Sequence, residues 1–106
     1  ERGYVLASDG QTTNLAVVNL KQPRLLARVP LGGNPTGIVV SPDGSRVLLS
    51  TMSPDGLTSV STSTYQVVKS YNAGEATSSL AVQGGSTAYV TNFSATQPGV
   101  TVVDVR

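Results

Sequence analysis

Short apolar runs alternate with clusters of Gly, Pro, Asn, Asp and Ser along the chain, and the clearest example is residues 34–50. There the apolar runs 38–41 and 46–50 flank Pro42-Asp43-Gly44. Pro42 fixes φ at the first central position of a turn, Asp43 can accept bonds from nearby backbone amides, and Gly44 supplies the positive φ with which the second strand leaves. The stretch therefore predicts a β-hairpin.

The same pattern predicts strands along the rest of the chain, with about 8 to 12 residues from one turn to the next. The ten expected strands are 4–7, 15–19, 25–29, 38–41, 46–50, 57–61, 67–71, 79–82, 87–91 and 100–105. Pro30 should end the third strand, and Gly32-Gly33-Asn34-Pro35 should lie outside any strand, because Pro and Gly weaken strand ladders. No window keeps a helical periodicity. The expected turn residues are Pro42, Asp43, Gly44, Pro54, Gly56, Gly84 and Gly85.

Several of these segments repeat at a nearly constant interval. Residues 15–19 recur as 57–61 and again as 100–104, at steps of 42 and 43. Residues 44–49 match 85–90 at a step of 41. One four-stranded sheet per about 40 to 45 residues is the repeat of a β-propeller blade, whereas a sandwich has no reason to repeat. The sequence therefore predicts an all-β fold made of propeller blades.

Two stretches make this prediction more specific. Residues 33–44, and the later Tyr89-Val90-Thr91-Asn92 followed by 100–104, resemble the YVTN β-propeller repeat. The resemblance implies strands A to D in each blade, so that the chain contains B-C-D, A-B-C-D and A-B-C, with boundaries 1–33, 34–74 and 75–106. A closed propeller needs at least four blades, so 106 residues cannot close a ring. We expect the remaining blades of a longer chain, or other copies of this one, to complete it.

Composition excludes several functions. Charged residues make up 12% of the chain and the net charge is +1, which provides no field for steering nucleic acid or an anionic membrane. The chain contains no Cys and no His, which excludes a disulfide, the common zinc sites and a Ser-His or Cys-His relay within it. No window approaches the roughly 18 apolar residues of a membrane span. A Ser/Thr-rich, Lys-poor sequence favours an exported protein.

The acidic residues offer little catalytic chemistry. Asp9, Asp43 and Asp55 each precede Gly, where turn geometry accounts for them. No loop holds more than one carboxylate, whereas a calcium site takes several oxygen ligands from one loop. We therefore predict no catalytic residue, no metal ligand and no cofactor.

Two surface patterns allow weak functional interpretations. Asn92-Phe93-Ser94 matches an N-glycosylation acceptor, but Asn92 already belongs to the repeat. Lys21, Arg24 and Arg28 form a small basic cluster, better explained by a solvated outer strand than by a nucleic-acid surface.

The YVTN resemblance implies a noncatalytic binding or structural module of an exported or cell-surface protein, with a protein or glycan ligand. The loops expected to bind it are 33–37 and 74–78 on one face of the propeller, and 8–14, 52–56 and 93–99 on the other. Their candidate binding residues are Asn34, Thr36, Glu75 and Thr77 on the first face, and Asp9, Asp55 and Phe93 on the second. The alternative is a part of a propeller enzyme, lactonase-like or a dehydrogenase subunit, whose catalytic or cofactor residues lie outside this chain.

Overall fold

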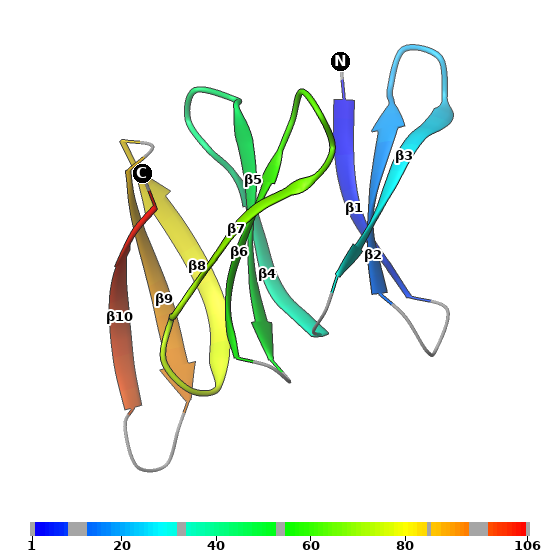
Figure 1. The fold of residues 1–106 in the computed structure, drawn as a ribbon. Helices are drawn as coiled ribbons and strands as arrows, with labels where there is room; N and C mark the ends of the chain where they lie inside the picture. The colour runs from blue at the N-terminus through cyan, green and yellow to red at the C-terminus, as the bar shows by residue number, and fades with distance from the viewer. Residues whose placement is uncertain are drawn as a thin grey trace. The chain divides into compact units, whose positions relative to one another are not determined.

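A computed structural model describes residues 2–8, 13–31, 34–52, 55–84, 86–93 and 98–105. These ranges contain ten β-strands and no helix, as the apolar pattern predicts (Figure 1). None of them therefore includes a helix of the length and apolarity that a bilayer requires. The chain divides into two compact units, Glu1–Gly32 and Gly33–Arg106.

The first unit is one antiparallel sheet with the strand order β1-β2-β3. Its strands are β1 (Arg2–Ser8), β2 (Thr13–Asn19) and β3 (Arg24–Leu31). Leu15, Val17 and Val29 are buried, whereas the turn from β2 to β3 and the start of β3 are exposed.

The second unit contains two antiparallel sheets. The four-stranded sheet has the order β4-β5-β6-β7, with β4 (Asn34–Val40), β5 (Arg46–Met52), β6 (Gly56–Ser61) and β7 (Val67–Tyr71). The three-stranded sheet has the order β10-β9-β8, with β8 (Thr77–Gln83), β9 (Thr87–Phe93) and β10 (Pro98–Asp104). The three sheets of the chain thus contain the predicted strands B-C-D, A-B-C-D and A-B-C.

The strand registers repeat along with the sequence. Tyr4 pairs with Val17 in β1-β2, and the equivalent pairs are Leu48 with Ser59 and Tyr89 with Val102. Register shifts also recur: one lies between Val17 and Val18, and another 42 residues later between Ser59 and Val60. Because these irregularities recur at the same interval as the sequence, each sheet is a copy of one structural unit.

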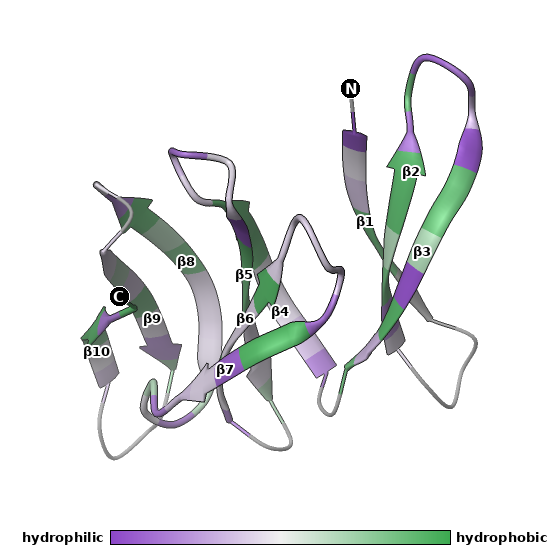
Figure 2. Cartoon of the chain, turned by 45° about the horizontal axis from the view of Figure 1, so that its top comes forward, coloured by the Kyte–Doolittle hydropathy of each residue, from purple (hydrophilic) through white to green (hydrophobic). Residues whose placement is uncertain are grey.

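The core of the second unit lies between its two sheets. The buried residues of this cluster come from both sheets and the segments that follow them: Leu48, Leu57, Ala73, Ala88, Val90, Val103 and Val105. Of these, Leu48 and Leu57 belong to the four-stranded sheet, and Ala88 and Val90 to the three-stranded one. The inner strand β5 is buried from Val47 to Thr51, on both of its faces, whereas the outer strands β3 and β7 expose the apolar Leu25, Val67 and Val68 (Figure 2).

Two prolines contradict the predicted strand limits. β3 continues through Pro30 to Leu31, and β4 begins at Asn34 and includes Pro35. Both strands lie at the edge of their sheets, where a residue without an N–H need not break a ladder. In β4 Pro35 pairs with Thr51, and the register shifts directly after it, between Pro35 and Gly37.

The β4-β5 hairpin has the predicted turn. The Gly44 amide donates to the Ser41 carbonyl at 2.8 Å, and Gly44 has a φ of 76°. Gly84 also has a positive φ, of 63°. Gly56 is instead the first residue of β6, and Pro54 and Gly85 lie outside the described residues.

Candidate binding end of the second unit

The strand pairings place the described residues of the predicted loops of the second unit at one end, which corrects the assignment of these loops to opposite faces. Asn34, the first residue of β4, pairs with Met52, the last residue of β5. Leu57 near the start of β6 pairs with Tyr71 at the end of β7. Neighbouring strands of the sheet run in opposite directions. The start of β4, the end of β5 and the start of β6 therefore lie at the same end of the sheet. Figure 1 shows this end at the foot of β4, β6 and β8.

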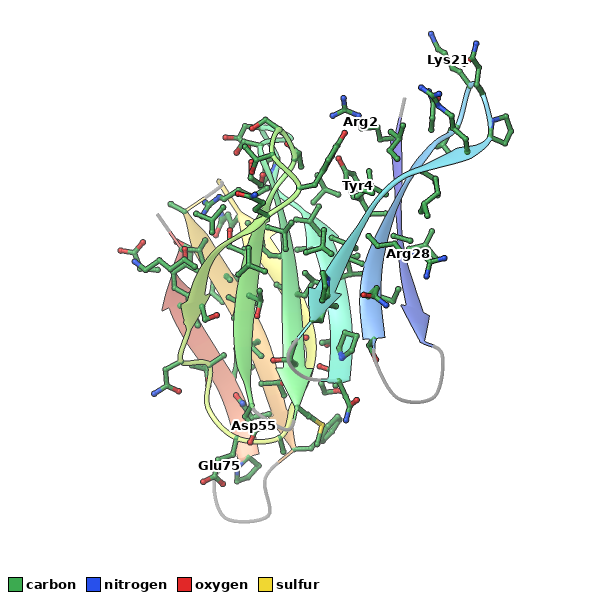
Figure 3. The ribbon with its side chains drawn as sticks, turned by 45° about the vertical axis from the view of Figure 1, so that its right-hand side comes forward. Arg2, Tyr4, Lys21, Arg28, Asp55 and Glu75 are labelled. Carbon is green, nitrogen blue, oxygen red and sulfur yellow. The ribbon has the colours of Figure 1, made fainter. Side chains whose placement is uncertain are left out.

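We call this end of the second unit the loop end, and define it by four exposed candidate residues: Asn34, Asp55, Glu75 and Phe93. Figure 3 shows Asp55 and Glu75 there. Phe93, at the last position of β9, is 77% exposed although its own amide is held by the Ala76 carbonyl at 2.9 Å. The loop end therefore presents two carboxylates, an amide and an aromatic ring to solvent.

Two further candidates belong to the packing between the sheets. Thr77 is 1% exposed, and its hydroxyl donates to the Thr51 carbonyl in β5 at 2.6 Å. The Thr36 hydroxyl lies 2.9 Å from the Ser50 hydroxyl and 3.4 Å from that of Thr77. These hydroxyls join the two sheets, a role that the local sequence does not reveal because Thr is common on solvated strands as well.

Asn92 fixes the connection from β7 to β8 behind the exposed residues. Its side-chain amide donates to the Ala73 carbonyl at 3.0 Å and to the Glu75 carbonyl at 2.9 Å, and its oxygen accepts from the Thr101 hydroxyl at 2.7 Å. Asn92 is 7% exposed, so the folded chain does not present its amide nitrogen for glycosylation. Its place in Tyr-Val-Thr-Asn is the sequence signal that could have identified this role.

The remaining acidic candidates are Asp9 and Asp43. Asp9 lies outside the described residues. Asp43, at the opposite end of the sheet, accepts bonds from the Ser45 amide and hydroxyl and from the Ser41 hydroxyl, at 2.7 to 3.0 Å. These bonds lower the pKa of Asp43 from 3.8 to about 2. Asp43 thus stabilises its own turn. Within the described ranges, no group of three or more Asp and Glu side chains could hold a metal ion.

Repeated antiparallel sheets of three or four strands, two of which pack on a shared core, define this chain as part of a β-propeller. A solved structure of Kuenenia stuttgartiensis hydrazine synthase has a similar fold, with a TM-score of 0.79 and 21% sequence identity. The similarity covers 96% of this chain and 32% of that one, so this chain spans about a third of its length. No known protein family and no curated protein matches the sequence.

Proposed function

We propose that this chain is a noncatalytic binding module of an exported propeller protein, and that a protein partner binds at the loop end. The observation that supports this is the strand register, which gathers Asn34, Asp55, Glu75 and Phe93 at one end of two sheets that share a core. Binding residues commonly occupy loops held by such a scaffold.

The chemistry of the loop end favours a protein partner. Phe93 is the most exposed of the large apolar residues that the structure describes, and Met52, which pairs with Asn34 in the strand register, is also exposed. Aromatic residues and Met are enriched at protein interfaces, and the carboxylates of Asp55 and Glu75 would favour a basic partner segment. A glycan is the competing ligand, because a ring beside carboxylates and amides also suits a sugar.

The export setting and the YVTN relationship are parts of the same proposal. The Ser/Thr-rich, Lys-poor composition and the Tyr-Val-Thr-Asn segment at 89–92 support them. A propeller enzyme is the second candidate, because hydrazine synthase, whose solved structure has the similar fold, is by its name an enzyme. Since 21% identity supports the fold alone, metal and cofactor analysis of the purified natural protein is the test of this alternative.

The test uses immobilised wild-type chain against two probes, a phage-displayed peptide library and a glycan array. We expect the wild-type chain to bind basic peptides from the library. The substitution Phe93→Ala should weaken the binding of these peptides at least tenfold. Val68→Ala, which also shortens an exposed apolar side chain but lies on β7, should leave binding unchanged. Selection of glycans alone, or peptides equally sensitive to both substitutions, would contradict the proposed partner.

A further inference from the structure

The connection from β7 to β8 holds an alanine in the left-handed region of the backbone. Ala76 has a φ of 49°, and among the described residues Tyr65 is the only other non-glycine residue with a positive φ. An alanine in this region is strained, because its Cβ crowds the following carbonyl oxygen, whereas glycine adopts the same φ without that strain. Such strain persists only where the surrounding structure holds the residue, and it is concentrated at functional sites.

Two asparagine side chains fix the first part of this connection. The Gly74 amide donates to the Asn72 side-chain oxygen at 3.2 Å. The Asn92 side chain donates to the carbonyls of Ala73 and Glu75, on either side of Gly74. Three consecutive residues are therefore each bound through a backbone atom before the chain reaches position 76.

Both sheets of the second unit fix the rest of the connection. The Ala76 carbonyl accepts a hydrogen bond from the amide of Phe93, the last residue of β9, at 2.9 Å. Thr77, the next residue, is buried, and its hydroxyl donates to the Thr51 carbonyl in the other sheet at 2.6 Å. Ala76 thus lies between residues that are bound on both sides, which is the setting that maintains a strained backbone.

Ala76 also joins two candidate residues of the loop end. It follows Glu75 directly in the sequence, and its carbonyl binds the amide of Phe93. An alanine restricts the arrangements open to this pair. A glycine at position 76, two residues after Gly74, would let the connection adopt many more conformations.

We propose that Ala76 is a positioning residue of the loop end, whose strained backbone holds Glu75 and Phe93 in the arrangement that binds a basic peptide. A connection that is ordered before the partner arrives removes an entropic cost that binding would otherwise include. The binding rests on the proposed function, whereas the positioning concerns the free chain, so the two can fail separately.

Three substitutions in the 106-residue chain test this role. Ala76→Gly releases the strain but frees the connection, whereas Ala76→Asn keeps it restricted, because asparagine tolerates the left-handed region. Ala81→Gly, at an exposed position in the middle of β8, is the matched control for an alanine-to-glycine change. We expect Ala76→Gly to lower the thermal midpoint less than Ala81→Gly does, because the released strain offsets the added freedom of the unfolded chain.

Amide hydrogen exchange in the absence of any ligand is the first measurement. In Ala76→Gly the Phe93 amide should exchange at least fivefold faster than in wild type, because its acceptor is no longer held. The Gly44 amide, which donates to the Ser41 carbonyl at the other end of the sheet, should keep its wild-type rate. In Ala76→Asn both amides should exchange as in wild type. A wild-type rate for Phe93 in Ala76→Gly, or equal acceleration in Ala76→Asn, would overturn the proposal.

Binding of a hexaarginine peptide, followed by titration calorimetry, is the second measurement. Ala81→Gly should bind the peptide with the wild-type Kd, and Ala76→Gly at least threefold more weakly, although a merely structural role would make affinity follow the thermal midpoint. Equal affinity of Ala76→Gly and wild type would overturn the proposal. If wild type does not bind the peptide, the proposed function fails, and hydrogen exchange still decides whether Ala76 positions the connection.

Discussion

Asp43 illustrates how a conspicuous acidic residue can have a purely local role. Its carboxylate accepts three hydrogen bonds from Ser41 and Ser45, which lower its pKa to about 2. Proline, aspartate and glycine together in a turn predict this role, because each favours turn geometry for its own physical reason.

The lowered pKa makes this turn's contribution depend on pH. A carboxyl whose pKa is lower in the folded than in the unfolded chain stabilises the fold above pH 3.8, and this contribution is lost as the pH falls towards 2. We therefore expect Asp43→Asn to lower the free energy of unfolding at pH 7, and the difference from wild type to shrink between pH 4 and about 2. Urea unfolding across this range measures it. A difference that stays constant with pH would contradict the assignment.

Ser50 and Ser59 are both fully buried, so their hydroxyls can be compared directly. Among the described residues, the Ser59 hydroxyl finds no hydrogen-bond partner, whereas that of Ser50 lies 2.9 Å from the Thr36 hydroxyl. The positions equivalent to Ser59 in the other two sheets are Val17 and Val102. Ser59 thus places an unpaired polar atom where the repeat otherwise has an apolar side chain.

Removing the two hydroxyls should have opposite effects. We expect Ser59→Ala to raise the free energy of unfolding by about 1 kcal/mol, because a buried unpaired donor is removed. Ser50→Ala should lower it by about 1 kcal/mol, because a satisfied buried bond is lost. Chemical unfolding of the two variants beside wild type measures both, and a shift in the same direction for both would contradict the bonding pattern.

At the scale of elements, the connection from β7 to β8 depends on close packing around Gly74. Gly74 has a φ of 80°, and a Cβ there would lie 2.8 Å from both the Asn92 side-chain nitrogen and the Thr101 hydroxyl. The Asn92 amide that would be displaced holds the carbonyls of Ala73 and Glu75. The connection and the last two strands therefore form one hydrogen-bonded unit.

Gly74→Ala should lower the free energy of unfolding by about 2 kcal/mol or more, since it adds both backbone strain and a steric clash. Gly84→Ala is the control: Gly84 has a φ of 63°, but a Cβ there would meet nothing within 4 Å. Gly84→Ala should therefore lower the free energy of unfolding only by the cost of holding alanine in this backbone conformation. Thermal or chemical unfolding measures both variants. If the two lose the same free energy of unfolding, the close contacts of Gly74 with Asn92 and Thr101 contribute nothing to stability.

The apolar pattern predicts the number and order of the strands correctly, because both follow from local turn chemistry and from burial. It fails at Pro30 and Pro35, since whether a strand tolerates proline depends on its place at the edge of a sheet. It also fails to separate Thr77, whose hydroxyl joins two sheets, from exposed candidates such as Asn34. These are long-range relationships that local sequence does not contain.

At the scale of the molecule, the sequence repeat gives the order of the blades. The strand registers show at which end of its sheet each strand begins and ends. The expectation of loops on opposite faces is wrong because residue spacing alone does not track strand direction through four antiparallel strands. Once direction is followed, every described candidate residue of the second unit lies towards the same end. The Asp43 and Gly84 turns lie at the other end, about 20 Å away along strands of this length.

A paramagnetic label at the loop end tests the gathering of these residues most directly. Because the chain contains no Cys, Asp55→Cys introduces a single attachment point for a nitroxide. We predict strong broadening of the amide signals of Asn34, Glu75 and Phe93 in NMR spectra, with those of Gly44 and Gly84 much less affected. Broadening of Gly44 and Gly84 with Glu75 spared would contradict the gathering of these residues at one end.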